Sequence, residues 1–377
     1  MTSTDTTDTA PAPTGDQQLD DSLVEEFADR FFTAVLGAQE IQAAYFGDIL
    51  GWYRALDTEG PLSPIELADA TDTHWRYAQE WLEHQAVAGW VTVAEPDAAP
   101  LERRYSLPAA HAAVLTDRDS LVHLVPLARF VTGVGKRADD LAEAYRTGGG
   151  VSWQEMGDDP REAQAAMNRP MFLQLFGPDY LPSIPAIDDL LRAGGRVADV
   201  GCGLGWSSIA VARQYPDALI DGFDPDLASV EAATRLAEQH GLDDRISFHA
   251  SDAADAPAVD GGYDLVMALE CIHDLSRPVD VLAAMRRLVS ADGVVMVMDE
   301  RVDDEFVAPG GPFERMLYGC SLTSCLPDGM SGTPSAATGT VMRPATLERY
   351  ALDAGFASVE VLPIDNDSFR FYRLHTT

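Results

Sequence analysis

Three glycines at alternate positions identify the part of this chain best suited to bind a ligand through its backbone. Gly201, Gly203 and Gly205 follow the apolar stretch 197–200 and precede another apolar stretch, 209–212. The pattern predicts a buried strand, a turn almost without side chains, and a helix. At such a turn a ligand can lie directly against the N–H groups of the helix N-terminus.

The carboxylate of Asp199, two residues before the first glycine, indicates which ligand would bind. In a partly buried site it repels a pyrophosphate and favours a ligand with an ammonium and a sulfonium, which describes S-adenosylmethionine. A dinucleotide is the competing interpretation, but its fingerprint is G-x-G-x-x-G. Here the third glycine comes one residue early, and Trp206 stands where a dehydrogenase has glycine. A P-loop is excluded because no G-K-[ST] ending follows.

Acidic or polar residues also end the strands expected further along the chain. The stretch 218–224 predicts a strand that ends in Asp224, roughly 20 residues after the glycines, where a carboxylate can bind ribose hydroxyls. The next expected strands are 245–250, 263–270 and 293–300, and helical stretches separate them. This alternation predicts an α/β fold with a mostly parallel sheet and its ligand site at the carboxyl edge.

These landmarks, in this order, resemble the class I S-adenosylmethionine-dependent methyltransferases over roughly residues 190 to 377. The resemblance implies S-adenosyl-L-methionine as cofactor and S-adenosyl-L-homocysteine as product. It implies a Rossmann-like sheet with an antiparallel C-terminal edge, formed by the stretches 357–362 and 369–374. The implied cofactor contacts are Asp199, Gly201, Cys202, Gly203 and Gly205 at the methionine end, Asp224 and Pro225 at the ribose, Asp252 and Ala253 at the adenine, and Glu270 near the methionine end.

The residues after the fourth expected strand are the candidates for catalysis. Methyl transfer is an in-line displacement, so the accepting atom must be deprotonated or carry a lone pair. His273, flanked by Asp274, is suited to take up the proton, and Glu270 is a second candidate. The alternative is that His273 only begins the following helix or bonds the backbone. Asp299 and Glu300, at the end of the fifth strand, are further candidates for orienting a substrate.

The first third of the chain predicts a helical domain with a winged-helix plan. Helices are expected over 25–53, from Ser63 and Pro64, and over 74–88, followed by wing strands at 90–94 and 104–107. This plan normally suggests DNA binding, but residues 64–110 contain eight acidic residues and only three arginines. Since DNA binding requires the opposite charge balance, we expect a dimerisation and lid module and no nucleic-acid partner.

The expected organisation has four parts. Residues 1–21 form a disordered tail, 22–115 the helical and winged-helix domain, 116–185 a helical connector and lid, and 186–377 the cofactor-binding domain. We expect one connecting helix over 121–144 and a long loop over 309–340.

The overall composition supports a globular protein of the cytoplasm. Of 377 residues, 46% are hydrophobic, and 61 acidic against 26 basic residues give a formal net charge of -35. Such a surface repels nucleic acids and anionic membranes. We expect neither a membrane span nor a signal peptide, no metal, and four cysteines that act as small buried hydrophobes. Apolar residues crowded on the first helix (Phe27, Phe31, Phe32 and Val35) predict a homodimer.

The expected function is methyl transfer from S-adenosylmethionine to a small molecule. Two alternatives stay open at this point. One is a transcription regulator that senses S-adenosylmethionine or a metabolite, and the other is an enzyme that carries out a non-methyl reaction of this cofactor.

Overall fold

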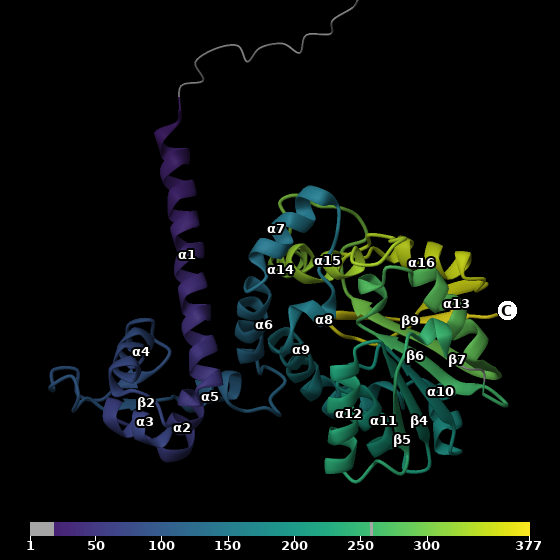
Figure 1. The fold of residues 1–377 in the computed structure, drawn as a ribbon, viewed down its shortest axis with the longest axis horizontal. Coiled ribbons are helices and arrows are strands. Elements are labelled where there is room, and N and C mark those ends of the chain that lie inside the picture. The colour runs from purple at the N-terminus through teal and green to yellow at the C-terminus, as the bar shows by residue number, and fades with distance from the viewer. Residues whose placement is uncertain (1–18, 257–258) are drawn as a thin grey trace, which may run out of the picture.

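The computed structural model describes residues 19–256 and 259–377 and begins with a helical region (Figure 1). Its elements are α1 (Asp21–Ile49), α2 (Trp52–Glu59), α3 (Pro64–Ala70), α4 (Trp75–Val87), the antiparallel pair β1 (Thr92–Val93) and β2 (Tyr105–Ser106), and α5 (Ala109–Leu115). The predicted helices and the two short strands are therefore present in this order. The predicted disordered tail lies almost entirely outside the described residues.

The start of α3 illustrates how local sequence sets these elements. The Ser63 side chain accepts a hydrogen bond from the Glu66 N–H, and the Glu66 carboxylate accepts one from the Ser63 N–H. This capping box, with Pro64 in the first turn, satisfies backbone donors that a helix start leaves free. Leu67 and Leu82 then pack α3 and α4 into the buried core of this region.

A seven-stranded sheet forms the second half of the chain, with strand order β5-β4-β3-β6-β7-β9-β8. Strands β3 to β7 pair in parallel, whereas β9 is antiparallel to both β7 and β8, as predicted for the C-terminal edge. The bounds are β3 (Arg196–Val200), β4 (Leu219–Asp224), β5 (Ile246–Ala250), β6 (Tyr263–Leu269), β7 (Val289–Glu300), β8 (Ser358–Val361) and β9 (Phe369–His375).

Helices cover both faces of this sheet, so its central strands are apolar on both sides. On one face α10 (Pro185–Arg192) and α11 (Trp206–Gln214) pack against side chains such as Met267 and Met296. On the other face α13 (Pro278–Leu288) and α16 (Pro344–Asp353) pack against side chains such as Val266 and Val295. Helix α12 (Leu227–Gln239) lies next to β4 and β5.

Between the two regions the chain forms a series of helices that reach over the carboxyl edge of the sheet (Figure 1). They are α6 (Val125–Gly135), α7 (Ala138–Thr147), α8 (Trp153–Met156), α9 (Asp158–Met171) and a π-helical segment, η1 (Phe172–Tyr180). The prediction of one helix over 121–144 is wrong, because the chain breaks between Gly135 and Ala138 and continues as a second helix.

The prediction of a loop over 309–340 is also wrong in part. This stretch contains α14 (Pro312–Cys320), the π-helical turn η4 (Ser321–Cys325) and α15 (Leu326–Gly329). Its glycines and prolines suggested irregular structure, yet Pro312 stands in the first turn of α14, where a missing N–H costs nothing. None of the helices in the described ranges is both long and apolar enough to span a bilayer.

Candidate active site

The loop between β3 and α11 has the backbone that only glycine adopts easily. Gly201, Gly203 and Gly205 have φ values of 69°, 51° and 78°, in the left-handed region. A Cβ on Gly205 would lie 2.5 Å from the Phe248 ring, so this glycine is also required by packing. A Cβ on Gly203 would meet nothing within 4 Å. The loop is therefore closely packed at Gly205 and open at Gly203.

Asp224, at the end of β4, ties this loop to the neighbouring strand. Its carboxylate accepts hydrogen bonds from the Gly203 N–H at 2.9 Å and the Asp226 N–H at 2.8 Å. Burial raises the pKa of Asp224 to about 6, against the lowering effect of these two bonds. The side chain also lines the large cavity described below, so it presents a partly satisfied carboxylate to whatever occupies that cavity.

Asp199 bonds to the start of α11 in this structure, and its contact with a ligand stays a prediction. It is buried, and its carboxylate accepts hydrogen bonds from the hydroxyls of Ser207 at 2.6 Å and Ser208 at 2.7 Å, both in the first turn of α11. Burial raises its pKa to about 6. Asp199 does not line the cavity, because these serine hydroxyls hold its carboxylate against the helix start.

A cavity of about 720 Å³ lies between the carboxyl edge of the sheet, α9 and α14. This volume falls in the range of small-molecule sites. The predicted residues that line it are Gly201, Cys202, Gly203, Asp224, Pro225, Glu270, His273 and Glu300. Asp199, Gly205, Asp252, Ala253 and Asp299 are not among the lining residues. Cys320 and Cys325, from the segment expected to be a loop, do line it.

The predicted adenine contacts lie outside this cavity. The Asp252 carboxylate accepts a hydrogen bond from the Ala254 N–H at 2.8 Å and so caps a short helical turn, η2 (Ala253–Asp255). Ala253 is buried against α13. Their contact with a ligand stays a prediction, and the local role seen here is that of a turn.

Glu270 follows β6 in an unusual backbone conformation, with φ at 54°. Its carboxylate accepts hydrogen bonds from the side-chain amides of Asn168 and Gln164, both on α9. Burial, together with the negative charge of Glu300, raises the pKa of Glu270 to about 8 despite these amides. A strained, buried acid at a strand end that lines a cavity is typical of a functional position.

His273 lies in the short turn η3 (Ile272–Asp274) and is surrounded by carboxylates. Its Nδ1 is 2.7 Å from Asp299 Oδ1 and 3.1 Å from Glu300 Oε2, and its Nε2 is 3.1 Å from Asp274 Oδ1. Burial by itself would lower the pKa of His273, but the three negative charges outweigh it and raise the pKa well above the usual 6.5. In this structure the imidazole is therefore held in its protonated form at neutral pH.

The same donors have the spacing of a metal site. Ligand atoms of His273, Asp299 and Glu300 lie within 4.8 Å of one another, as do those of His273, Asp274 and Cys325. Both groups share one imidazole, whose Nδ1 stands at hydrogen-bond distance from Asp299. A proton between Nδ1 and Asp299 accounts for this contact, and the expectation that no metal binds here stays a prediction.

Helix α9 contributes cavity residues that the sequence did not single out. Arg161, Gln164 and Asn168 lie at helical spacing and all line the cavity. The buried Arg161 guanidinium donates to Asp226 at 2.6 Å, next to the Asp224 loop, while the two amides bind Glu270. The signal that could have revealed them is their spacing at positions i, i+3 and i+7, which places all three polar side chains on one face of a helix.

The buried acids predict that stability of the ligand-free protein falls as pH rises from 7 to 8. Glu270 and Glu300 have pKa values raised to about 8, whereas a glutamate of the unfolded chain has a pKa of about 4.3. In this interval the folded state holds protons that the unfolded state has released, which costs on the order of 1 kcal/mol per pH unit and group. His273, with its raised pKa, changes stability in the same direction.

Urea unfolding at pH 7 and pH 8 measures the difference in the free energy of unfolding between the two pH values. The double variant Glu270→Gln/Glu300→Gln should lose most of it, whereas Glu348→Gln, an exposed acid on α16, should retain it. Equal stability of the parent at both pH values would contradict the assigned electrostatics.

Comparison with known proteins identifies proteins of similar sequence and fold. Residues 191–324 match the family model described as a methyltransferase domain. The chain is 32% identical to ajmaline N-methyltransferase of Rauvolfia serpentina over 111 residues, which are 29% of this chain and 38% of that protein. It is 33% identical to 27-O-demethylrifamycin SV methyltransferase of Amycolatopsis mediterranei, over 29% of this chain and 40% of that protein. The matched region thus spans about two fifths of the length of these relatives.

Solved structures extend the likeness to nearly the whole chain. Mitomycin 7-O-methyltransferase has a TM-score of 0.63 at 21% identity, covering 94% of this chain and 99% of that one. Human N-acetylserotonin methyltransferase, solved in complex with S-adenosylmethionine, has a TM-score of 0.61 at 18% identity, covering 96% and 99%. At these identities the likeness establishes the fold. The chain therefore has the fold of these methyltransferases, and its residues 191–324 match the methyltransferase domain model.

Proposed function

We propose that this protein transfers a methyl group from S-adenosylmethionine to a small molecule in the cytoplasm. One observation carries the proposal: the open glycine loop, Asp224, Glu270 and His273 all line the same cavity. The methyltransferase relatives and the fold agree with this assignment.

The residues present fit this cofactor. Gly203 leaves open space where any other residue would place a side chain, so a ligand can approach the backbone there. Asp224 offers carboxylate lone pairs to ribose hydroxyls. Glu270 has a raised pKa in the ligand-free protein, and a cationic methionine end beside it would lower that pKa and favour its charged form. When bound, the cofactor supplies an electrophilic methyl group on a sulfonium.

His273 is the proposed proton acceptor for the substrate. Asp299 holds its Nδ1, which fixes the orientation of the ring in the cavity wall. Only the neutral imidazole can take a proton, and the surrounding carboxylates raise the pKa of His273. Activity that uses this base should therefore increase with pH above neutrality. Glu270 is proposed to hold the methionine end rather than to move a proton.

Methyl transfer itself is tested with S-adenosylmethionine labelled in the methyl group and a small-molecule metabolite extract. We expect the label in a discrete low-molecular-mass product. Label that remains in the cofactor, with cofactor binding intact, would favour the sensing regulator. Label recovered in methylthioadenosine, which keeps the methyl group when the sulfonium gives up its aminocarboxypropyl group instead, would favour the non-methyl reaction.

Once a product is known, His273→Ala tests the base. Turnover should fall by about 10²–10⁴-fold, and the increase in rate with pH should disappear. Affinity for S-adenosylhomocysteine should stay near that of the parent. A variant that keeps its rate and only melts earlier would show that His273 has a structural role.

The winged-helix region is proposed to mediate assembly, and its charges argue against a role in DNA binding. Its three arginines are all paired with glutamates: Arg76 with Glu80, Arg103 with Glu83 and Arg104 with Glu66. No cation of the described 64–110 stretch is therefore left for a phosphate. This balance also disfavours the regulator alternative.

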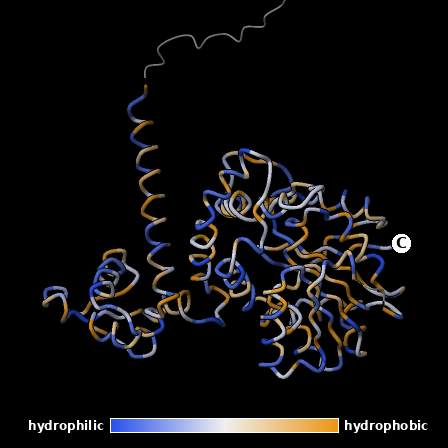
Figure 2. Tube along the Cα trace, in the orientation of Figure 1, coloured by the Kyte–Doolittle hydropathy of each residue, from blue (hydrophilic) through white to orange (hydrophobic). Residues whose placement is uncertain are grey.

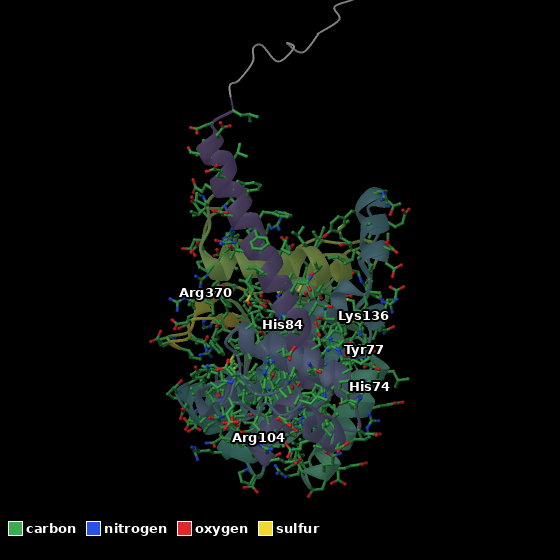
Figure 3. The ribbon with its side chains drawn as sticks, turned by 90° about the vertical axis from the view of Figure 1, so that its left-hand side faces the viewer. His74, Tyr77, His84, Arg104, Lys136 and Arg370 are labelled. Atoms are coloured by element: carbon green, nitrogen blue, oxygen red, sulfur yellow. The ribbon has the colours of Figure 1, made fainter. Side chains whose placement is uncertain are left out.

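We propose that the molecule is a homodimer that covers the N-terminal half of α1. In Figures 1 and 3 this half stands clear of the rest of the protein, and Figure 2 shows apolar segments along it. Phe27, Phe31 and Phe32 are more than 60% exposed, which is uncommon for neighbouring aromatic residues of a monomer. A second copy of the same helix would bury them.

Light scattering at micromolar concentration should give twice the chain mass. Phe27→Glu/Phe31→Glu should give a monomer, because paired charges would be buried in the interface. Leu352→Glu, at an exposed apolar position on α16, should leave the dimer intact. A monomeric parent would overturn the proposal.

A further inference from the structure

The cavity has two chemically different linings. Most of it is apolar, with aromatic and aliphatic side chains from the connector and α14, including Phe130, Trp153, Phe172, Phe313 and Met316. One part is acidic and is formed by Asp274, Glu300 and Asp328, together with Thr340. We refer to these four residues as the acidic wall. They come from η3, the end of β7, α15 and the segment before α16.

The acidic wall contains polar atoms without a hydrogen-bond partner among the described residues. They are Glu300 Oε2, Asp274 Oδ1 and Thr340 Oγ1, and Thr340 is 98% buried. The protonated His273 directs its Nδ1 hydrogen to Asp299 at 2.7 Å, and its Nε2 lies 3.1 Å from Asp274 Oδ1. Glu300 Oε2 and Thr340 Oγ1 therefore remain without a donor among the described residues, which costs free energy for buried acceptors.

The described residues also supply too little positive charge to balance this wall. The protonated His273 lies beside it, but its single charge is shared among Asp274, Asp299 and Glu300. Arg161 is the one arginine or lysine among the described lining residues, and it is bound to Asp226 and Asp158, both at 2.6 Å. Burial raises the pKa of Glu300 to about 8 and, together with the negative charge of Asp274, that of Asp328 to about 7, although His273 lowers both. The charge of His273 thus does not make up for the burial of these carboxyls, and an anionic ligand would add a further negative charge to the wall.

The cofactor accounts for other acids of the cavity. Asp224 and Glu270, next to the glycine loop, are the ones assigned to its ribose and methionine ends. Glu300, Asp274 and Asp328 are left for the second ligand.

We propose that the methyl acceptor is an apolar molecule that carries a protonated amine, and that the acidic wall binds this amine. An ammonium group supplies both the missing donors and the missing positive charge, while the remaining apolar lining accepts the body of the molecule. The same wall excludes carboxylates and phosphates. This inference rests on the proposed function in that it names the ligand as the methyl acceptor. The preference for a cation is a property of the cavity itself.

Binding of three matched probes tests the inference: naphthylethylamine, naphthylethanol and naphthylacetic acid. They share one apolar ring and differ in charge. Calorimetric titration at pH 7.5, with the full chain saturated with S-adenosylhomocysteine, should give about tenfold tighter binding of the amine than of the alcohol, because hydrogen bonds to charged groups are the stronger ones. The acid should not bind measurably. Equal binding of amine and alcohol, or binding of the acid, would overturn the inference.

Substitutions locate the preference. Glu300→Gln and Asp328→Asn should each weaken amine binding about tenfold and leave alcohol binding within a factor of about two. Glu348→Gln, at an exposed site outside the cavity, should change neither. If both cavity variants retain the amine preference of the parent, the acidic wall is not its source and the inference fails.

Titrations without S-adenosylhomocysteine separate this inference from the proposed function. A cavity that prefers the amine but does not bind S-adenosylhomocysteine would refute the cofactor assignment and keep the cation site. A cavity that binds S-adenosylhomocysteine without preferring the amine would keep the cofactor assignment and refute the cation site.

Discussion

Buried negative charge at one edge of the sheet is the constraint on which the rest of this structure depends. Parallel strands bring their carboxyl ends together, and Asp224, Glu270, Asp299 and Glu300 all stand at such ends. Burial disfavours their charged forms, so each needs a donor or a cation. Backbone N–H groups donate hydrogen bonds to Asp224, the side-chain amides of α9 donate to Glu270, and His273 donates to Asp299. Carboxylates that the protein supplies with too few donors or cations can bind a ligand instead, and this makes the edge of the sheet a binding site.

Helix α9 connects the two parts of that site. Through Arg161 it is fixed to Asp226 in the loop after β4, and through Gln164 and Asn168 it is fixed to Glu270 after β6. The helix therefore covers the glycine loop from one side and orients the acid that faces it. Because α9 also packs against α6, and α6 against α1, the N-terminal region is mechanically joined to the cavity.

Much of the fold could be predicted from the sequence, because its signals are local. Glycines with positive φ, strand ends with acids and the capping residue Ser63 each act within a few residues. Helix α14 was missed although Phe313, Met316 and Leu317 stand at helical spacing, because the glycines and prolines around it were interpreted as a loop. The contacts of Glu270 with Asn168 were also out of reach, since they join residues about a hundred positions apart. The role of Asp199 depended on which way one carboxylate turns, and spacing alone does not determine that.

The central claim is that the open glycine loop and Asp224 bind the adenosyl cofactor. Isothermal titration with S-adenosylhomocysteine tests it on the parent, Gly203→Arg, Asp224→Ala and Gly241→Arg. Gly241 also has positive φ and open space around its Cβ position, but it lies outside the cavity lining, so it is the matched control. We expect binding by the parent and the control, and loss of about a hundredfold or more in the two site variants. Gly203→Arg fills the open space at the loop, and Asp224→Ala removes the carboxylate proposed to bind the ribose. Equal affinity of all four proteins, or no binding by the parent, would contradict the account.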